Sequence, residues 1–266
     1  MSVPLFKATI KSNWTILLIF VVLLCMYMGS IVSIYNPDSS QEMEELLKLL
    51  PEELAKAMGI GDLSGGLTEF LGNYFYGMLV FMIPLIYVSI MGNRLMARQV
   101  DNGSMAYLLS TPNNRVKIAV TQGIYFLLSV AVLFIFLTGA TIGMSQSMYP
   151  NLLDFPAFIR LNACAFLLTC AISAICWFFS CLFNDAKYSL AFGVGIPVLF
   201  FMLNVFGGIR EELDWMASLS IYRLFRADGI LSGSANIPGI CLVYIAIISA
   251  LYSAGICVFK RKNLPL

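Results

Sequence analysis

Between Leu161 and Asn184 the sequence reads LNACAFLLTCAISAICWFFSCLFN, with no Asp, Glu, Lys or Arg. A helix needs about 20 apolar residues to cross the hydrocarbon core of a bilayer, and this stretch exceeds that length. Its apolar residues lie on every face of a helix, whereas a surface helix of a soluble bundle is apolar along one stripe. The pattern therefore predicts a membrane-spanning helix.

Five further stretches lack charged residues, so the chain has six such windows: 12–35, 70–93, 118–153, 161–184, 188–209 and 229–259. A charge at the centre of a spanning helix costs roughly 2.5–3.5 kcal/mol, so six clean windows between charged segments do not arise by chance. In the two longest windows, Pro150 and the polar residues 145–147 predict a helix end near Gly143, and Pro238 predicts a start near Ile237. We therefore predict an all-α membrane protein with six transmembrane helices, at about 13–35, 70–92, 118–143, 158–183, 188–207 and 237–258.

The composition supports a membrane protein and excludes several kinds of active site. Hydrophobic residues make up 59% of the chain and charged residues 12%, against about 25% charged in soluble domains. The absence of histidine excludes serine and cysteine triads and the common zinc sites. The seven cysteines lie in apolar runs, where we interpret them as small apolar side chains. No Gly-Lys dipeptide occurs, so the sequence has no Walker A phosphate loop.

The distribution of Lys and Arg predicts the orientation. With the N-terminus inside, the inner segments hold ten basic residues and two acidic ones, Asp101 and Asp185, while the outer segments hold six basic and thirteen acidic residues. Basic residues concentrate in cytoplasmic loops, so both termini are predicted to be cytoplasmic. We expect a multi-pass protein of a bacterial plasma membrane.

The outer segment 36–69 is longer than a turn. Its apolar residues recur at helical spacing, at Met43, Leu46, Leu47, Leu50, Leu54 and Met58. This spacing predicts amphipathic helices on the outer surface, and a partly ordered loop is the alternative.

The outer segment 208–230 mixes apolar and charged residues, and it is too charged to span and too apolar to remain in water. We predict a short re-entrant helical hairpin. Trp215 and Tyr222 suit the membrane interface, and together with Phe225 they are our candidates for an outer gate. The alternative is that this segment only covers the helix ends.

The longest inner connection, residues 93–117, reads NRLMARQVDNGSMAYLLSTPNNRVK. Asn102-Gly103 is predicted to break the helix that continues from the second span, Ser104 to cap a second short helix, and Thr111-Pro112 to end it. The result is a short amphipathic helix parallel to the membrane, between two basic anchors. Such an element suits the docking of a cytosolic partner.

This loop resembles that of the ABC-2-type transporter permeases, with a basic and acidic helix end followed by Gly-Ser, Leu-Leu, Thr-Pro and Arg. The resemblance covers nearly the whole chain, including the large outer loop, the re-entrant segment and the ending FKRKNLPL at 259–266. It implies an ABC-2 exporter fold of the ABCG-like, type V kind, in which the loop 93–117 carries the coupling helix that contacts a cytosolic nucleotide-binding ATPase. ATP and Mg would then be bound by that partner, and this chain would hold no cofactor or metal.

The resemblance also implies which residues take part. The expected ATPase-coupling residues are Arg98, Gln99, Asp101, Gly103, Met105, Leu108, Leu109, Pro112 and Arg115, with Asp185 in a second, smaller contact. Members of the family commonly have Glu where Gln99 or Asp101 falls, so which of these two makes the contact stays open. The second and fifth helices are expected to line the path at a dimer interface, where Pro84 and Pro197 either serve transport or only bend packed helices.

We therefore expect the permease subunit of an ATP-driven exporter, not itself an enzyme, paired with a second copy or a sister permease. The spans carry no charged residue that a proton relay would use, which favours apolar or amphipathic cargo. Similarity to small exporters of toxin and antimicrobial peptides favours an amphipathic peptide, with a lipid or drug as the alternative. A secondary transporter without an ATPase stays open, whereas a prenyl-type membrane protease is disfavoured because histidine is absent. Nothing predicts nucleic-acid binding.

Overall fold

The computed structural model describes residues 1–35, 66–74, 76, 80–209 and 211–263. Within these ranges the regular structure is helical, without strands. The amphipathic helices predicted at 36–69 lie outside the described residues, apart from the start of α4 (Leu67–Tyr74).

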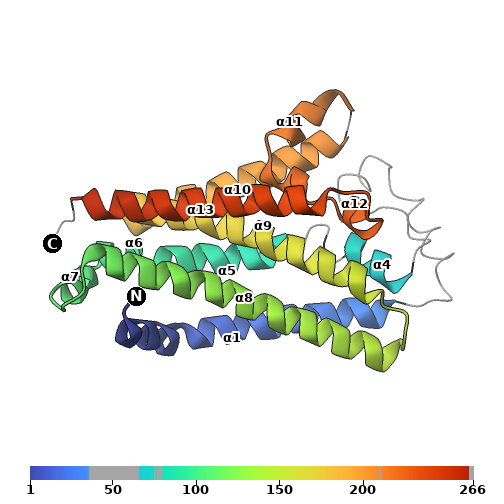
Figure 1. Cartoon of the computed structure of the whole chain (residues 1–266), viewed down its shortest axis with the longest axis horizontal. Coiled ribbons are helices and arrows are strands. Elements are labelled where there is room, and N and C mark those ends of the chain that lie inside the picture. Colours follow the sequence, from blue (N-terminus) through green and yellow to red (C-terminus); the bar gives the residue numbers. More distant parts are fainter. Residues whose placement is uncertain (36–65, 75, 77–79, 210, 264–266) are drawn as a thin grey trace.

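The long helices lie side by side in an elongated bundle (Figure 1): α1 (Val3–Ile34), α5 (Val80–Leu95), α8 (Arg115–Met148), α9 (Phe155–Leu182), α10 (Ala186–Ile209) and α13 (Ile237–Arg261). Among the described residues, five helices are long and apolar enough to cross a membrane, and α5 is the one long helix outside that set. The predicted second span corresponds to α4 and α5 together. The all-α membrane fold is thus confirmed, and these five helices with α4 and α5 are consistent with six spans.

The quoted stretch 161–184 forms most of α9, the central helix of the bundle. In its most apolar window 72% of residues are buried, against 17–39% for the other four candidate spans. Glycines of the neighbouring helices let them approach α9 closely, which explains part of this burial. A Cβ added to Gly92 of α5 would lie 3.0 Å from Cys176 Cβ, and one on Gly255 of α13 would lie 3.0 Å from Trp177 Nε1. The Trp177 ring stacks on Tyr252 at 5.5 Å, which joins α9 to α13.

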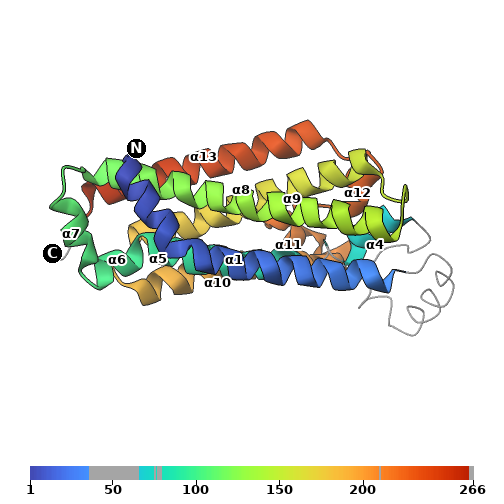
Figure 2. The same ribbon diagram turned by 90° about the horizontal axis from the view of Figure 1, so that it is seen from below.

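Two helix ends differ from the sequence-based expectation. The third long helix does not end near Gly143, because α8 continues to Met148 and Ser147 Oγ donates within the helix to the Met144 carbonyl at 2.9 Å. The first helix begins at Val3, ahead of the predicted span at 13, and its first turns run at an angle to the rest of α1 (Figure 2). Helices extend past the bilayer where their polar turns meet water or headgroups, which hydropathy alone does not reveal.

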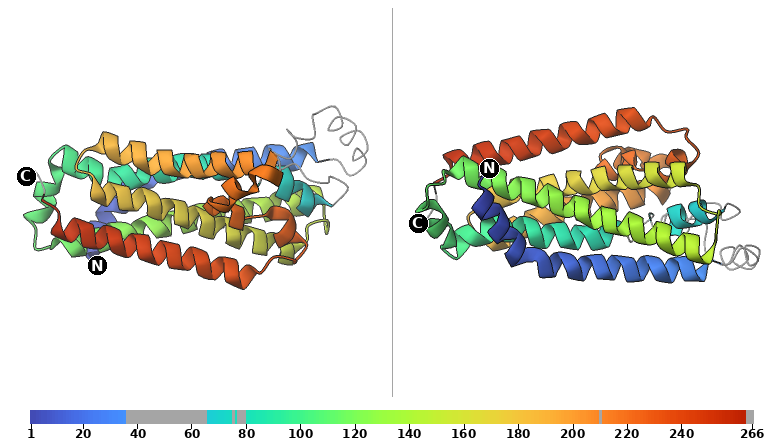
Figure 3. Two further views of the ribbon diagram at one scale, coloured as in Figure 1. Left: turned by 90° about the horizontal axis from the view of Figure 1, so that it is seen from above. Right: turned by 60° about the horizontal axis from the view of Figure 1, so that its bottom comes forward.

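The two ends of the bundle carry different elements. The N-terminus and the end of α13 lie at one end, here called the terminal end, together with the short helices α6 (Ala97–Asp101) and α7 (Ser104–Leu109) (Figures 1 and 3). At the opposite end, here called the far end, lie α4 and α12 (Ala227–Leu231). Between α10 and α12 the chain forms a 3₁₀ turn η2 (Glu211–Leu213), α11 (Asp214–Ser218) and a second 3₁₀ turn η3 (Ile221–Leu224).

Candidate functional site

The predicted coupling segment folds as two short helices, α6 and α7, that meet at a sharp turn. The turn is made at Gly103, whose φ of +73° lies in the left-handed region that glycine adopts without strain. The predicted break at Asn102-Gly103 is therefore present. Ser104 does not cap the second helix, however, since the N-cap is Gly103 and Ser104 Oγ instead donates back to the Gln99 carbonyl at 3.2 Å.

One side of α6 and α7 packs against the bundle. Val100 and Met105 are buried, and Leu108 and Leu109 are half-buried against the hydrophobic core. The backbone N–H of Ala97 donates to Ser180 Oγ of α9 at 2.9 Å. The hydrogen bond fastens α6 to the central helix α9, and α7 packs against the hydrophobic core through Met105, Leu108 and Leu109.

The opposite side of α7 presents Tyr107, whose side chain is 79% exposed. This is the most exposed of the large apolar or aromatic side chains in the described part of the chain. The sequence-based assignment chose Leu108 and Leu109 as contact residues, but the structure turns these two partly inward and Tyr107 outward. Helical spacing could have revealed this, because Tyr107 lies two positions from the buried Met105 and so on the other side of the helix.

The remaining predicted coupling residues differ in exposure. Arg98, Asp101 and Pro112 are exposed, whereas Gln99 is only partly accessible. Asp185, on the link between α9 and α10, accepts a hydrogen bond from the Lys187 backbone N–H at 2.7 Å.

The C-terminal segment ties the terminal end together. Arg115 at the start of α8 donates to the Lys262 carbonyl at 2.5 Å, and Lys262 Nζ donates to the Cys181 carbonyl of α9 at 3.1 Å. Asn184 Nδ2 reaches the Asn263 carbonyl at 3.4 Å. Burial lowers the pKa of the Lys262 ammonium to about 8. Residues 262–263 thus join the starts and ends of three spans, including both segments predicted to contact an ATPase.

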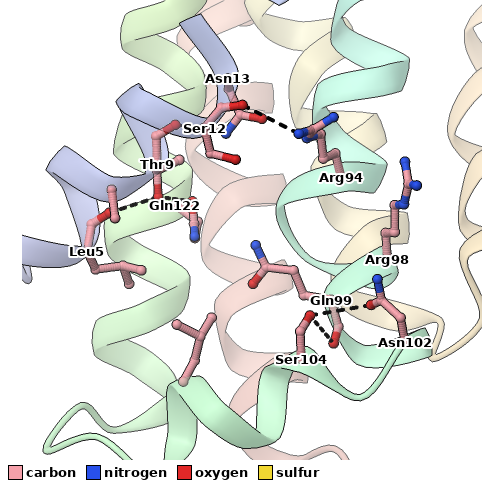
Figure 4. Close-up of a pocket in the computed structure, with 12 residues that line it drawn as sticks. Leu5, Thr9, Ser12, Asn13, Arg94, Arg98, Gln99, Asn102, Ser104 and Gln122 are labelled. Carbon is pink, nitrogen blue, oxygen red and sulfur yellow. Dashed lines mark hydrogen bonds between the residues drawn. The ribbon is translucent and has the colours of Figure 1, made fainter.

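A cavity of about 420 Å³ opens beside the coupling segment. It is lined from α1, α8 and the α5–α7 region by Leu5, Ala8, Thr9, Ser12, Asn13, Arg94, Arg98, Gln99, Asn102, Ser104, Leu108 and Gln122 (Figure 4). Thr9 Oγ donates to Gln122 Oε1 at 3.2 Å, which joins α1 to α8 at one wall. Sequence reasoning did not find this cavity because its walls come from three separate parts of the chain.

The three predicted gate residues do not form one cluster. Trp215 of α11 is 61% exposed, whereas Tyr222 and Phe225 are buried. The Tyr222 ring packs against Phe201 of α10 at 5.5 Å, and the Phe225 ring lies 6.5 Å from Tyr76. Two of the rings hold the segment to the bundle, whereas Trp215 is exposed, and the assignment of the three residues to an outer gate stays a prediction.

The segment between α10 and α12 folds back along α10, whereas its re-entry into a membrane stays a prediction. Ser220 Oγ donates to the Phe200 carbonyl at 2.6 Å, which places η3 beside the middle of α10. Tyr244 of α13 donates to the Ile221 carbonyl at 3.0 Å. A Cβ on Gly207 of α10 would lie 2.5 Å from the Ala217 backbone nitrogen, so α11 and α10 touch at their backbones.

An ion pair closes this fold-back. Arg223 donates to both carboxylate oxygens of Asp214, at 2.7 and 2.8 Å. The hydrogen-bonded guanidinium holds the pKa of the Asp214 carboxyl below its usual value. Both side chains are accessible to solvent, and exposed ion pairs contribute little to the free energy of folding. We therefore infer that this pair fixes the geometry of the turn and adds little to its stability.

The sequence model of a family described as "ABC-2 family transporter protein" matches residues 6–264, which is nearly the whole chain. No curated protein matches. Within the described residues, no group of three His, Cys, Asp or Glu is placed to hold a metal ion.

Proposed function

Since the chain belongs to the ABC-2 family of transporter proteins, we propose that it is the permease subunit of an ATP-driven exporter whose ATPase is a separate polypeptide. The observation that carries this proposal is the coupling segment: α6 is hydrogen-bonded to the central helix α9, and α7, which follows it, presents a large aromatic side chain, Tyr107, to the outside.

An exposed aromatic side chain on a rigid element is the kind of group that anchors a protein interface. Tyrosine is enriched among residues whose truncation costs 2 kcal/mol or more of binding free energy. Asp101 is also exposed on this segment and supplies polar surface for the contact. We assign Tyr107 as the anchor of ATPase docking, with Asp101 and Pro112 around it.

The orientation fits this assignment. The terminal end carries the ten basic residues of the inner segments, so we place it in the cytoplasm with both termini. A cytosolic ATPase then meets α7 and the α9–α10 link, where Asp185 lies and Tyr188 is 56% exposed. The C-terminal residues 262–263 accept hydrogen bonds from Arg115 at the start of α8 and from Asn184 of the α9–α10 link, so they join the end of the coupling segment to this link.

We propose export of an amphipathic cargo, with a peptide as the first candidate and a lipid or drug as the alternative. Support comes from the spans, whose central turns contain no charged residue to bind an ionic substrate or relay protons. The segment 208–230 at the far end is the proposed outer gate, held shut through Ser220, Tyr222 and Tyr244. A second permease copy or sister chain completes the pathway.

Docking is tested by co-purification with the co-expressed ATPase. Tyr107→Ala removes the anchor without disturbing the core. Loss of an anchor residue costs about 2 kcal/mol of binding free energy, which weakens the affinity between permease and ATPase about 30-fold, so ATPase recovery is expected to fall. Trp215→Ala is the matched control, since it also truncates an exposed aromatic side chain but at the far end. Leu108→Asp is less informative because Leu108 is half-buried, so this variant would also disturb the packing of α7 on the core. Equal recovery with Tyr107→Ala and Trp215→Ala would refute the docking assignment.

A further inference from the structure

The cavity beside the coupling segment is positively charged. Arg94 and Arg98 line it, and no Asp or Glu is among its lining residues. Neither guanidinium makes an ion pair with a described residue, and Arg94 has one long hydrogen bond, of 3.4 Å, to the Ser12 carbonyl. Arg94 lies beside Ser12 and Asn13, and the exposed Arg98 lies at the rim of the cavity, so both charges there lack a described ionic partner.

The same cavity contains hydrogen-bond acceptors that lack donors. Asn13 is 4% exposed, and its amide nitrogen donates to the Thr9 carbonyl at 2.9 Å, which fixes the amide orientation. Its buried Oδ1 then has no donor, and neither has the buried Oε1 of Gln99. Buried acceptors of this kind are normally satisfied by a bound group. An anion without hydrogen-bond donors could pair with the two arginines, but it could not donate a hydrogen bond to Asn13 Oδ1 or Gln99 Oε1.

The position of the cavity indicates where such a ligand comes from. One wall is the first part of α1, where Ile10 and Trp14 are exposed next to Asn13. Leu5, Ala8 and Leu108 add apolar surface to the lining. Tryptophan is enriched at the level of lipid headgroups, and basic pockets at that level bind headgroup phosphates.

We propose that this cavity binds a phosphodiester that also carries a hydroxyl or ammonium donor, supplied by a phospholipid headgroup at the terminal end of the bundle. Arg94 and Arg98 bind the phosphate oxygens, and Asn13 Oδ1 and Gln99 Oε1 accept from the headgroup donor. The bound lipid would sit between α1 and the coupling segment and brace the two against each other.

The test uses the purified full chain and native mass spectrometry with added lipids. We expect retention of phosphatidylglycerol or phosphatidylethanolamine, weaker retention of phosphatidylcholine because its headgroup has no N–H or O–H donor, and none of diacylglycerol. Arg94→Gln and Arg98→Gln should each weaken retention about tenfold. Arg160→Gln, which removes an exposed charge on α9 outside the cavity, is the control and should change nothing.

If the glutamine variants are unstable, lipid retention can be measured in lysine variants and in the presence of salt or a soluble competitor. Arg94→Lys and Arg98→Lys preserve the charge and should retain part of the binding, and high salt should release lipid from the unmodified chain. Glycerol 3-phosphate, as a soluble competitor, distinguishes the sources: displacement at micromolar concentration would show that the site takes a soluble phosphate ester and would overturn the lipid assignment. Equal retention by the unmodified chain and the double glutamine variant would overturn the site altogether.

Discussion

Replacing Gly207 by Ala tests whether the segment after α10 is held against that helix. The added Cβ would lie 2.5 Å from the Ala217 nitrogen and 2.6 Å from its Cβ. Normal contacts are about 3.5–4.0 Å, so α11 must move by about 1 Å, and no flexible side chain can yield instead. Overpacking of this kind typically costs about 1–3 kcal/mol.

Gly195→Ala is the matched control, because Gly195 lies on the same helix and its added Cβ meets nothing within 4 Å. Both variants gain the same helix propensity, about 1 kcal/mol, so their difference isolates the contact with Ala217. In thermal unfolding of the purified protein we expect Gly207→Ala to melt a few degrees below Gly195→Ala. Hydrogen exchange should rise at 214–218 in Gly207→Ala alone. Equal melting and equal exchange would refute the packing of α11 on α10.

Three further predictions follow from other parts of the molecule. The rate of Lys262 acylation measures the pKa of its amine, because only the neutral amine is a nucleophile. In the folded chain this rate should reach half its maximum near pH 8, and on unfolding the midpoint should move to about 10.5. A midpoint near 10.5 in the folded chain would contradict the burial of Lys262. In a variant without native cysteines, Ser234→Cys should react with an impermeant thiol reagent in intact cells and Ser110→Cys should not; the reverse would invert the orientation. Phe225→Ala should lower the free energy of unfolding by about 3 kcal/mol through a cavity, whereas Trp215→Ala should leave it unchanged, and equal effects would contradict their different burial.

Much of the fold was predictable from hydropathy. Uncharged windows located the long helices, and the resemblance to ABC-2 permeases is confirmed by the family match over 6–264. Hydropathy did not reveal which helix is central, because all the windows are apolar. The choice depends on side-chain size at the contacts: Gly92 of α5 approaches Cys176 of α9, and Gly255 of α13 leaves room for Trp177 of α9. This is a property of pairs of helices rather than of one window.

The site was predictable only in part. The break at Asn102-Gly103 follows from glycine's freedom at positive φ, and the structure has it. The outward orientation of Tyr107 could have been inferred from its helical spacing to Met105, whereas the extent to which Leu108 and Leu109 are buried depends on how α7 docks on the bundle. The cavity between α1 and the coupling segment needed tertiary structure, since Asn13, Arg94 and Gln122 are far apart in sequence.

The coupling claim is tested most directly by placing a photoactivatable amino acid at Tyr107 and irradiating intact cells that also produce the ATPase. The 79% exposed side chain at the terminal end predicts a covalent adduct between the permease and the ATPase. The same probe at Trp215, 61% exposed on the opposite side of the proposed membrane, should give none. Absence of the Tyr107 adduct, or an ATPase adduct at Trp215, would contradict docking at α7.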